Sequence, residues 1–134
     1  MKIGLVELPY LYLLDPDGNN WVELNDSPLI SKQILMANLL AGGFDVELFN
    51  LKEGSDEEEL GTVQWKGMTL RKVIKGRRIS SLDPHACDAW GVTNNFTMYR
   101  EMTCRLVKHL ATGKKPVVMG GSDVLAEPKP YSHS

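Results

Sequence analysis

Two short polar segments are the strongest candidates for chemistry in this 134-residue sequence. They are Thr93-Asn94-Asn95 and Gly120-Gly121-Ser122, and each directly follows an apolar run. Hydroxyl and amide side chains can hydrogen-bond a polar ligand, and glycines let the backbone approach one closely. Both segments are therefore candidates for part of a ligand site. For the glycine pair, the alternative is a tight strand-to-helix turn that touches no ligand.

A second group of reactive side chains, His85, Cys87 and Asp88, would suit a small α/β enzyme. One segment, however, shows no base with a residue that orients it, so these three residues are interpreted as the approach to a strand. Cys87 and Cys104 are the only cysteines. They are too few for a disulfide framework and too far apart for a zinc or redox pair, and we expect buried or half-buried thiols.

The polar segments must be positioned by the elements around them. Short apolar runs predict buried strands at residues 2–6, 44–49, 88–93 and 116–119. Helical spacing predicts one helix from Ser27-Pro28 to about Ala41, stopped by Gly42-Gly43, and another that ends before Gly113. A third helix should begin after Ser122.

The remaining segments give weaker patterns. Residues 10–26 are rich in turn formers and are expected to form a long loop. Residues 52–82 are expected to form an insertion, in which the acidic run 52–60 is an exposed helix or loop. The pattern of residues 62–79 fits either a hairpin or a strand followed by a short helix. Trp65 and Trp90 are assigned to the core.

This order of segments predicts one α/β domain over residues 1–134, with a doubly wound, Rossmann-like or flavodoxin-like parallel sheet. The sheet would form a three-layer sandwich and lack its last strand. In such sheets ligands bind beyond the carboxyl ends of the strands, at the point where the strand order reverses. The loops after the first, third and fourth strands all fall at that edge.

Composition and missing motifs exclude several classes of function. A net charge of −2 attracts no nucleic acid, and the absence of a signal peptide or a membrane-spanning run leads us to expect a cytoplasmic protein that binds no membrane. Thr93 stands where a phosphorylated receiver domain needs aspartate. A flavodoxin would need a hydroxyl-rich phosphate loop after the first strand, and a dinucleotide domain would need glycines at the start of the first helix, which opens instead with Ser27-Pro28.

Four segments in order resemble the N-terminal cobalamin (vitamin B12)-binding domain of cobalamin-dependent radical S-adenosylmethionine enzymes. They are residues 27–29, 41–46, 88–93 and 115–122, and the resemblance covers roughly residues 1–130. It implies that Thr93, Asn94 and Asn95 contact the cobalamin tail or the corrin amides, and that Gly120, Gly121 and Ser122 let the backbone approach the tail. The chain would then hold cobalamin as a methyl carrier for a radical S-adenosylmethionine domain, in the same parent chain or in a separate one.

Two features depart from related patterns. Methyl-transfer and mutase carriers place Asp-x-His-x-x-Gly after the first strand, but residues 7–26 contain no histidine, and Asp83-Pro84-His85 lies before the third strand with Asp88 in place of the glycine. The Cys-x-x-x-Cys-x-x-Cys motif that holds an iron-sulfur cluster is also absent. The cluster and S-adenosylmethionine would therefore belong to the partner domain, and this chain alone is not expected to catalyse. The alternative is a cofactor-free interaction or scaffold domain with a degenerate cobalamin-binding fold.

Overall fold

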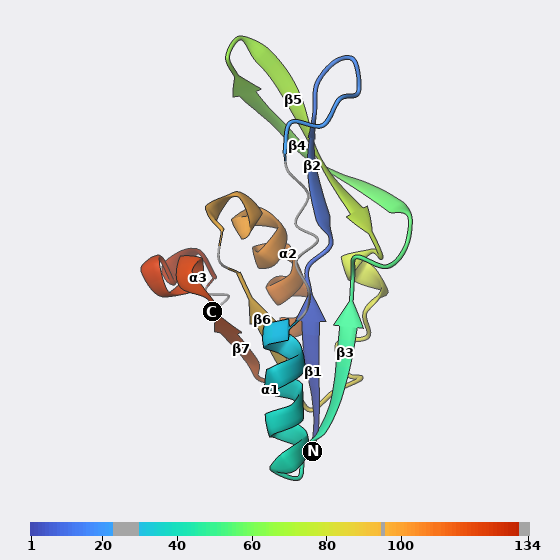
Figure 1. Ribbon diagram of the computed structural model, residues 1–134, viewed down its shortest axis with the longest axis vertical. Coiled ribbons are helices and arrows are strands. Elements are labelled where there is room, and N and C mark those ends of the chain that lie inside the picture. Colours follow the sequence, from blue (N-terminus) through green and yellow to red (C-terminus); the bar gives the residue numbers. More distant parts are fainter. Residues whose placement is uncertain (23–29, 95, 132–134) are drawn as a thin grey trace.

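The computed structural model describes residues 1–22, 30–94 and 96–131, which form an α/β structure with two sheets (Figure 1). Four parallel strands have the order β3-β1-β6-β7, and three antiparallel strands have the order β2-β5-β4. The strands are β1 Lys2–Glu7, β2 Tyr10–Leu14, β3 Asp45–Asn50, β4 Asp56–Trp65, β5 Met68–Gly76, β6 Ala89–Thr93 and β7 Val117–Gly120. The helices are α1 Ile30–Ala41, α2 Arg100–Ala111 and α3 Ser122–Ala126, with single 3₁₀ turns at Ile79–Ser81, Thr97–Tyr99 and Lys129–Tyr131.

The parallel sheet confirms the four strands predicted from the apolar runs. On one face, Val6 lies beside Phe49 and Val92 in register, and all three belong to one buried cluster with Leu106 of α2. The other face carries α1, from which Lys32 reaches Glu7 at the end of β1. Because both faces bear apolar side chains, the strands read as continuous apolar runs.

Helix α1 ends where the sequence predicts. Gly43 adopts a positive φ of 91°, and the amide of Phe44 donates to the carbonyl of Leu39, which is the left-handed stop expected of a glycine at this position. The predicted start at Ser27-Pro28 lies outside the described residues. None of the described helices is long and apolar enough to cross a membrane.

The antiparallel sheet corrects two expectations. The predicted loop over residues 10–26 is wrong for Tyr10–Leu14, which form β2 because Leu11 and Leu14 are buried in pairing with β5. For the acidic run, the expected helix or loop holds for residues 52–55, which form the turn before β4, and is wrong for residues 56–60, which are part of β4. There its carboxylates pair across the hairpin with basic residues of β5: Glu57 lies 3.1 Å from Lys75, and Glu59 pairs with Arg71.

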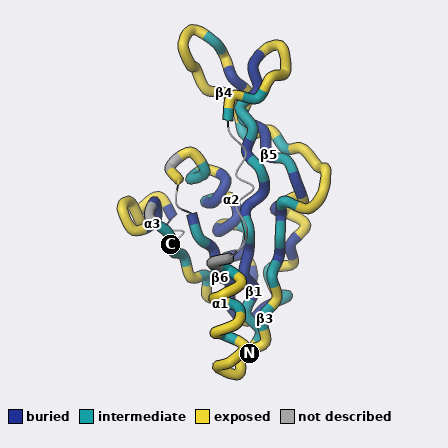
Figure 2. The backbone as a smooth tube through the Cα atoms, viewed as in Figure 1, coloured by how far each residue is buried: buried dark blue, intermediate teal, exposed yellow. Residues whose placement is uncertain are grey.

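Of the two interpretations of residues 62–79, the hairpin is correct. The turn between β4 and β5 has positive φ at Lys66 (49°) and Gly67 (77°), as a tight two-residue hairpin turn requires. The core assignment is confirmed for Trp90, which is 1% exposed, and is wrong for Trp65, which is 51% exposed. The turn carries Trp65 to the end of a ribbon that extends beyond α2 (Figures 1 and 2).

Candidate functional site

The predicted ligand residues do meet at the carboxyl edge of the parallel sheet. Thr93 ends β6 and pairs in register with Gly120, which ends β7, and both are half-buried. Asn94 follows at once and is 2% exposed. Asn95 lies outside the described residues, as does the side chain of Ser122, whose backbone begins α3.

Asn94 is bound by the protein itself. Its amide nitrogen donates to the carbonyl of Phe96 at 2.9 Å and to the hydroxyl of Tyr131 at 2.8 Å, and its side-chain oxygen accepts from the amide of Phe96 at 3.1 Å. Both amide hydrogens are therefore used inside the protein. These bonds give Asn94 a role in positioning the loop after β6, and its contact with a ligand stays a prediction.

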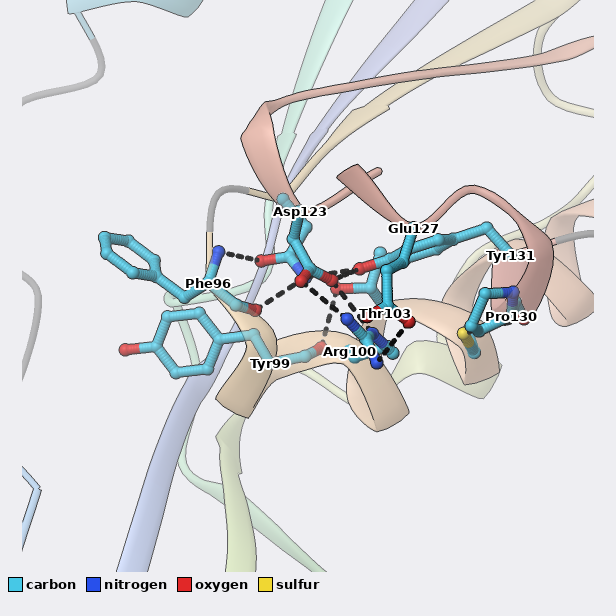
Figure 3. Close-up of polar contacts among 10 residues, drawn as sticks. Phe96, Tyr99, Arg100, Thr103, Asp123, Glu127, Pro130 and Tyr131 are labelled. Carbon is cyan, nitrogen blue, oxygen red and sulfur yellow. Dashed lines mark hydrogen bonds and ion pairs between the residues drawn. The ribbon is translucent and has the colours of Figure 1, made fainter. Parts of the chain in front are cut away.

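A polar cluster that Asn94 contacts through Tyr131 joins α2 to the segment after β7 (Figure 3). Arg100 donates to both carboxylate oxygens of Asp123, at 3.0 and 2.8 Å, and Tyr131 donates to the same carboxylate. The bidentate pair with Asp123 raises the pKa of Arg100, while burial, followed by the adjacent carboxylate, raises the pKa of Tyr131. Arg100 therefore stays a cation and Tyr131 a neutral phenol. We call the cluster of Arg100, Asp123 and Tyr131 the structural clasp, because it holds α2 against the segment after β7.

Gly121 is explained by the tight-turn alternative. Its φ is +100°, and a Cβ there would lie 2.4 Å from the carbonyl oxygen of Asn94. The close approach is thus to the protein's own backbone, and a bulky residue could not be placed there without disturbing the fold. At Gly120 a Cβ would meet only the methyl of Thr93, at 3.7 Å. Of the predicted residues the structure describes fully, Thr93 and Gly120 remain available to a ligand.

Three charged residues at this edge carry no role in the sequence analysis. Glu7, the last residue of β1, accepts from Lys32 of α1 at 2.6 Å and from Lys52, just after β3, at 2.8 Å. The three side chains are only 12–16% exposed. Burial favours protonation of Glu7, but the hydrogen bonds from the two lysines outweigh it and lower its pKa. The available signal was a charged residue that ends a buried strand at the predicted edge.

Glu7, Lys32 and Lys52 line a small cavity of about 80 Å³ together with Thr93. It lies at the carboxyl ends of β1 and β6, and the chain passes from β1 to β3 on one side and returns to β6 on the other. This is the point where the strand order reverses, so the position matches the predicted ligand crevice.

An apolar groove made of two neighbouring hollows lies along the antiparallel sheet, and one of the hollows shares the lining residue Leu11 with this cavity. A hollow of about 560 Å³ is lined by Leu13, Trp21, Val63, Trp65 and Met98, among others. A neighbouring hollow of about 400 Å³ shares three of these residues and also touches Leu11, which lines the small cavity. The volumes fall within the usual range of ligand pockets, about 300–1,000 Å³.

The exposed indole of Trp21 is held in this groove by Asp15. The indole nitrogen donates to the Asp15 carboxylate at 2.8 Å, and the other carboxylate oxygen accepts from the amides of Asp17 and Asn19, both at 2.9 Å. The indole hydrogen bond, followed by the backbone bond from Asn19, lowers the pKa of Asp15. An exposed aromatic side chain with a fixed orientation is typical of a binding surface.

His85, Cys87 and Asp88 lie at the amino end of β6, across the sheet from these cavities. His85 is exposed, and Asp88 accepts from the amide of Lys2. Burial raises the pKa of Cys87, which keeps it a thiol. The interpretation of this segment as an approach to a strand is therefore favoured. As expected, Cys87 is buried and Cys104 half-buried. The described residues contain no group of three or more histidine, cysteine, aspartate or glutamate side chains that could hold a metal ion.

No protein-family model, curated protein or solved structure matches this chain.

Proposed function

We propose that this chain is a cobalamin-binding module of a radical S-adenosylmethionine enzyme. The observation that carries the proposal is the position of the charged cavity at the sheet edge next to the apolar groove, with Leu11 lining both. Cobalamin combines a broad macrocycle with a polar nucleotide tail, and a groove with one apolar part and one polar part is complementary to both. The macrocycle would lie against Trp65 and Val63, with Thr93 and Gly120 facing the tail.

The topology supports a finer description of the fold. The order β3-β1-β6-β7 is that of the first four strands of a doubly wound sheet. In register, Val118 of β7 lies beside Gly91, on the face that carries α1, yet it is 67% exposed. In a complete three-layer sandwich a helix would cover that position. We infer a doubly wound sheet without its last strand and the helix that follows it.

The residues at the site fit a carrier without a protein imidazole on cobalt. Among the described histidines, His85 lies at the opposite edge of the sheet, and His109 bonds the carbonyl of Leu82 through Nε2. When bound, cobalamin supplies a transferable methyl group. The protein's own part is to hold and orient the cofactor, while the iron-sulfur cluster and S-adenosylmethionine would be held by the partner domain.

The test is a visible absorption titration of the purified chain with hydroxocobalamin, followed by desalting. We expect the corrin bands to travel with the protein. Trp65→Ala should weaken binding about tenfold, because a buried aromatic contact of this kind contributes about 1–2 kcal/mol. Leu125→Ala removes a side chain that is also exposed, at 80%, but lies on α3 away from the groove. It serves as the matched control and should leave affinity unchanged; equal losses in both variants would contradict the site.

The second candidate is a cofactor-free interaction or scaffold domain with a degenerate cobalamin-binding fold. It is favoured by the internal use of Asn94, whose amide hydrogens are taken by Phe96 and Tyr131. Loss of all corrin colour on desalting, with the fold intact, would select this candidate.

A further inference from the structure

Among the described residues that line the small cavity, positive and negative charges do not balance. Its described lining residues include two lysines, Lys32 and Lys52, and one carboxylate, Glu7. The two ammonium groups share that one carboxylate, and all three side chains are largely shielded from water. Charged groups in such places are normally compensated. The described residues leave one positive charge over.

The geometry points to a binding site for a monoanionic phosphate group in this cavity, formed by Lys32, Lys52 and Thr93. The identity of this phosphate group rests on the proposed function: it is the phosphodiester that links the nucleotide to the corrin side chain of cobalamin. One phosphodiester charge would balance the two ammonium groups and one carboxylate of the described lining residues.

The chemistry of the lining suits this ligand. Each lysine has three N–H donors and binds phosphate as a point charge, so it can serve Glu7 and a phosphate oxygen together. Thr93 adds a hydroxyl at the end of β6. Lys52 is further placed by the ring of Tyr10, whose centroid lies 5.5 Å from Nζ. The volume of about 80 Å³ suits one small group and excludes a macrocycle.

The two possible roles of Glu7 predict opposite effects of its replacement on anion binding. If Glu7 serves only to hold the two lysines in place, Glu7→Gln should weaken anion binding. If the cavity recognises an anion through its excess charge, removing the carboxylate raises the local charge from one to two and strengthens binding. We expect Glu7→Gln to bind cobalamin about threefold to tenfold more tightly, and Lys52→Met to bind it about tenfold less tightly.

The experiment compares cobalamin with cobinamide, a corrin that lacks the nucleotide and its phosphodiester. Affinity is measured by absorption titration for the wild-type chain, Glu7→Gln, Lys52→Met and the control Lys75→Met. Lys75 is an ion-paired lysine of β5, 3.1 Å from Glu57, that does not line the cavity. The first two variants should change cobalamin affinity in opposite directions and change cobinamide affinity less than twofold. Equal changes for both corrins would overturn the phosphate site, and weaker cobalamin binding by Glu7→Gln would overturn recognition of the phosphate through an excess of positive charge.

A second measurement separates this inference from the proposed function. Thermal unfolding is followed with inorganic phosphate against chloride at equal ionic strength. Phosphate should raise the midpoint of the wild type and of Lys75→Met, but not that of Lys52→Met. If no corrin binds but phosphate protects in this pattern, the cobalamin proposal fails and the anion site stands. If corrin binds without dependence on Lys52 and phosphate gives no protection, the anion site fails alone.

Discussion

Replacing Gly121 with alanine should destabilise the protein far more than the same change at Gly120. The added Cβ at position 121 would lie 2.4, 2.7 and 2.9 Å from the carbonyl oxygen, carbonyl carbon and amide nitrogen of Asn94. That backbone cannot move aside easily. The Asn94 amide donates to the carbonyl of Gly120 at 3.0 Å, and its carbonyl accepts from the amide of Asp123 at 3.2 Å.

Two effects lower the free energy of unfolding when Gly121 is replaced by alanine. A side chain in a backbone region that only glycine adopts freely costs about 1–3 kcal/mol, and forcing an atom into a packed site costs about 1–3 kcal/mol more. A total of about 2–6 kcal/mol would lower the unfolding midpoint by roughly 6–24 °C, at about 3–4 °C per kcal/mol in a domain of this size. At Gly120 the nearest atom is 3.7 Å away and the backbone is extended, so alanine should stay within about 1 kcal/mol of the wild type.

The assay is urea unfolding followed by circular dichroism, with both variants and the wild type measured together. Both variants replace glycine with alanine, so the difference between their free energies of unfolding reports the effect of the position alone. A Gly121→Ala protein within about 0.5 kcal/mol of Gly120→Ala would refute the close approach to Asn94, and the tight-turn explanation of Gly121 with it.

Two other contacts give further predictions. Tyr131→Phe removes the hydroxyl that joins Asn94 to Asp123, and should lower the free energy of unfolding by about 1–3 kcal/mol, as measured by urea unfolding; an unchanged midpoint would count against the clasp. The pKa of Asp15 is lower in the folded than in the unfolded protein, so the stability it contributes is present above its unfolded pKa of about 4 and is lost as pH falls through the folded value. The fluorescence of Trp21, compared with that of Trp21→Phe, should therefore change in acid, and Asp15→Asn should abolish this change.

The parallel half of the fold could be predicted from sequence because its signals are local. Strands such as Ala89–Thr93 are continuous apolar runs, and the end of α1 has a glycine at the position that needs positive φ. The antiparallel half could not be predicted in this way. Tyr10–Leu14 becomes a strand only through pairing with residues 71–75, about 60 positions later in the chain, and the acidic run becomes β4 through charges on its hairpin partner. Tertiary pairing overrides local pattern in both cases.

The candidate site also has features that could be predicted from the sequence and features that could not. The sheet edge and the proximity of Thr93 to Gly120 follow from topology, and the structure confirms them. Sequence reasoning could not show that Asn94 is occupied by Tyr131, 37 positions away, or that Glu7 sits between Lys32 and Lys52. Those contacts join elements that are remote in the chain, and polarity alone does not distinguish an internal partner from a ligand.

The edges of the two sheets differ in how they resist added strands. Strand β3 carries Asp45 and Glu47, and β4 carries most of the acidic run. These charged side chains disfavour the pairing of either strand with a strand of another chain. The edge of β2 is partly covered by the turn that follows it, where the amide of Trp21 donates to the carbonyl of Leu13. Strand β7 has the sequence VVMG, without charge, and pairs only with β6 among the described residues. Self-association of this chain through its strands would therefore begin at β7, and a charged residue in place of Val118 would protect the protein from aggregation at high concentration.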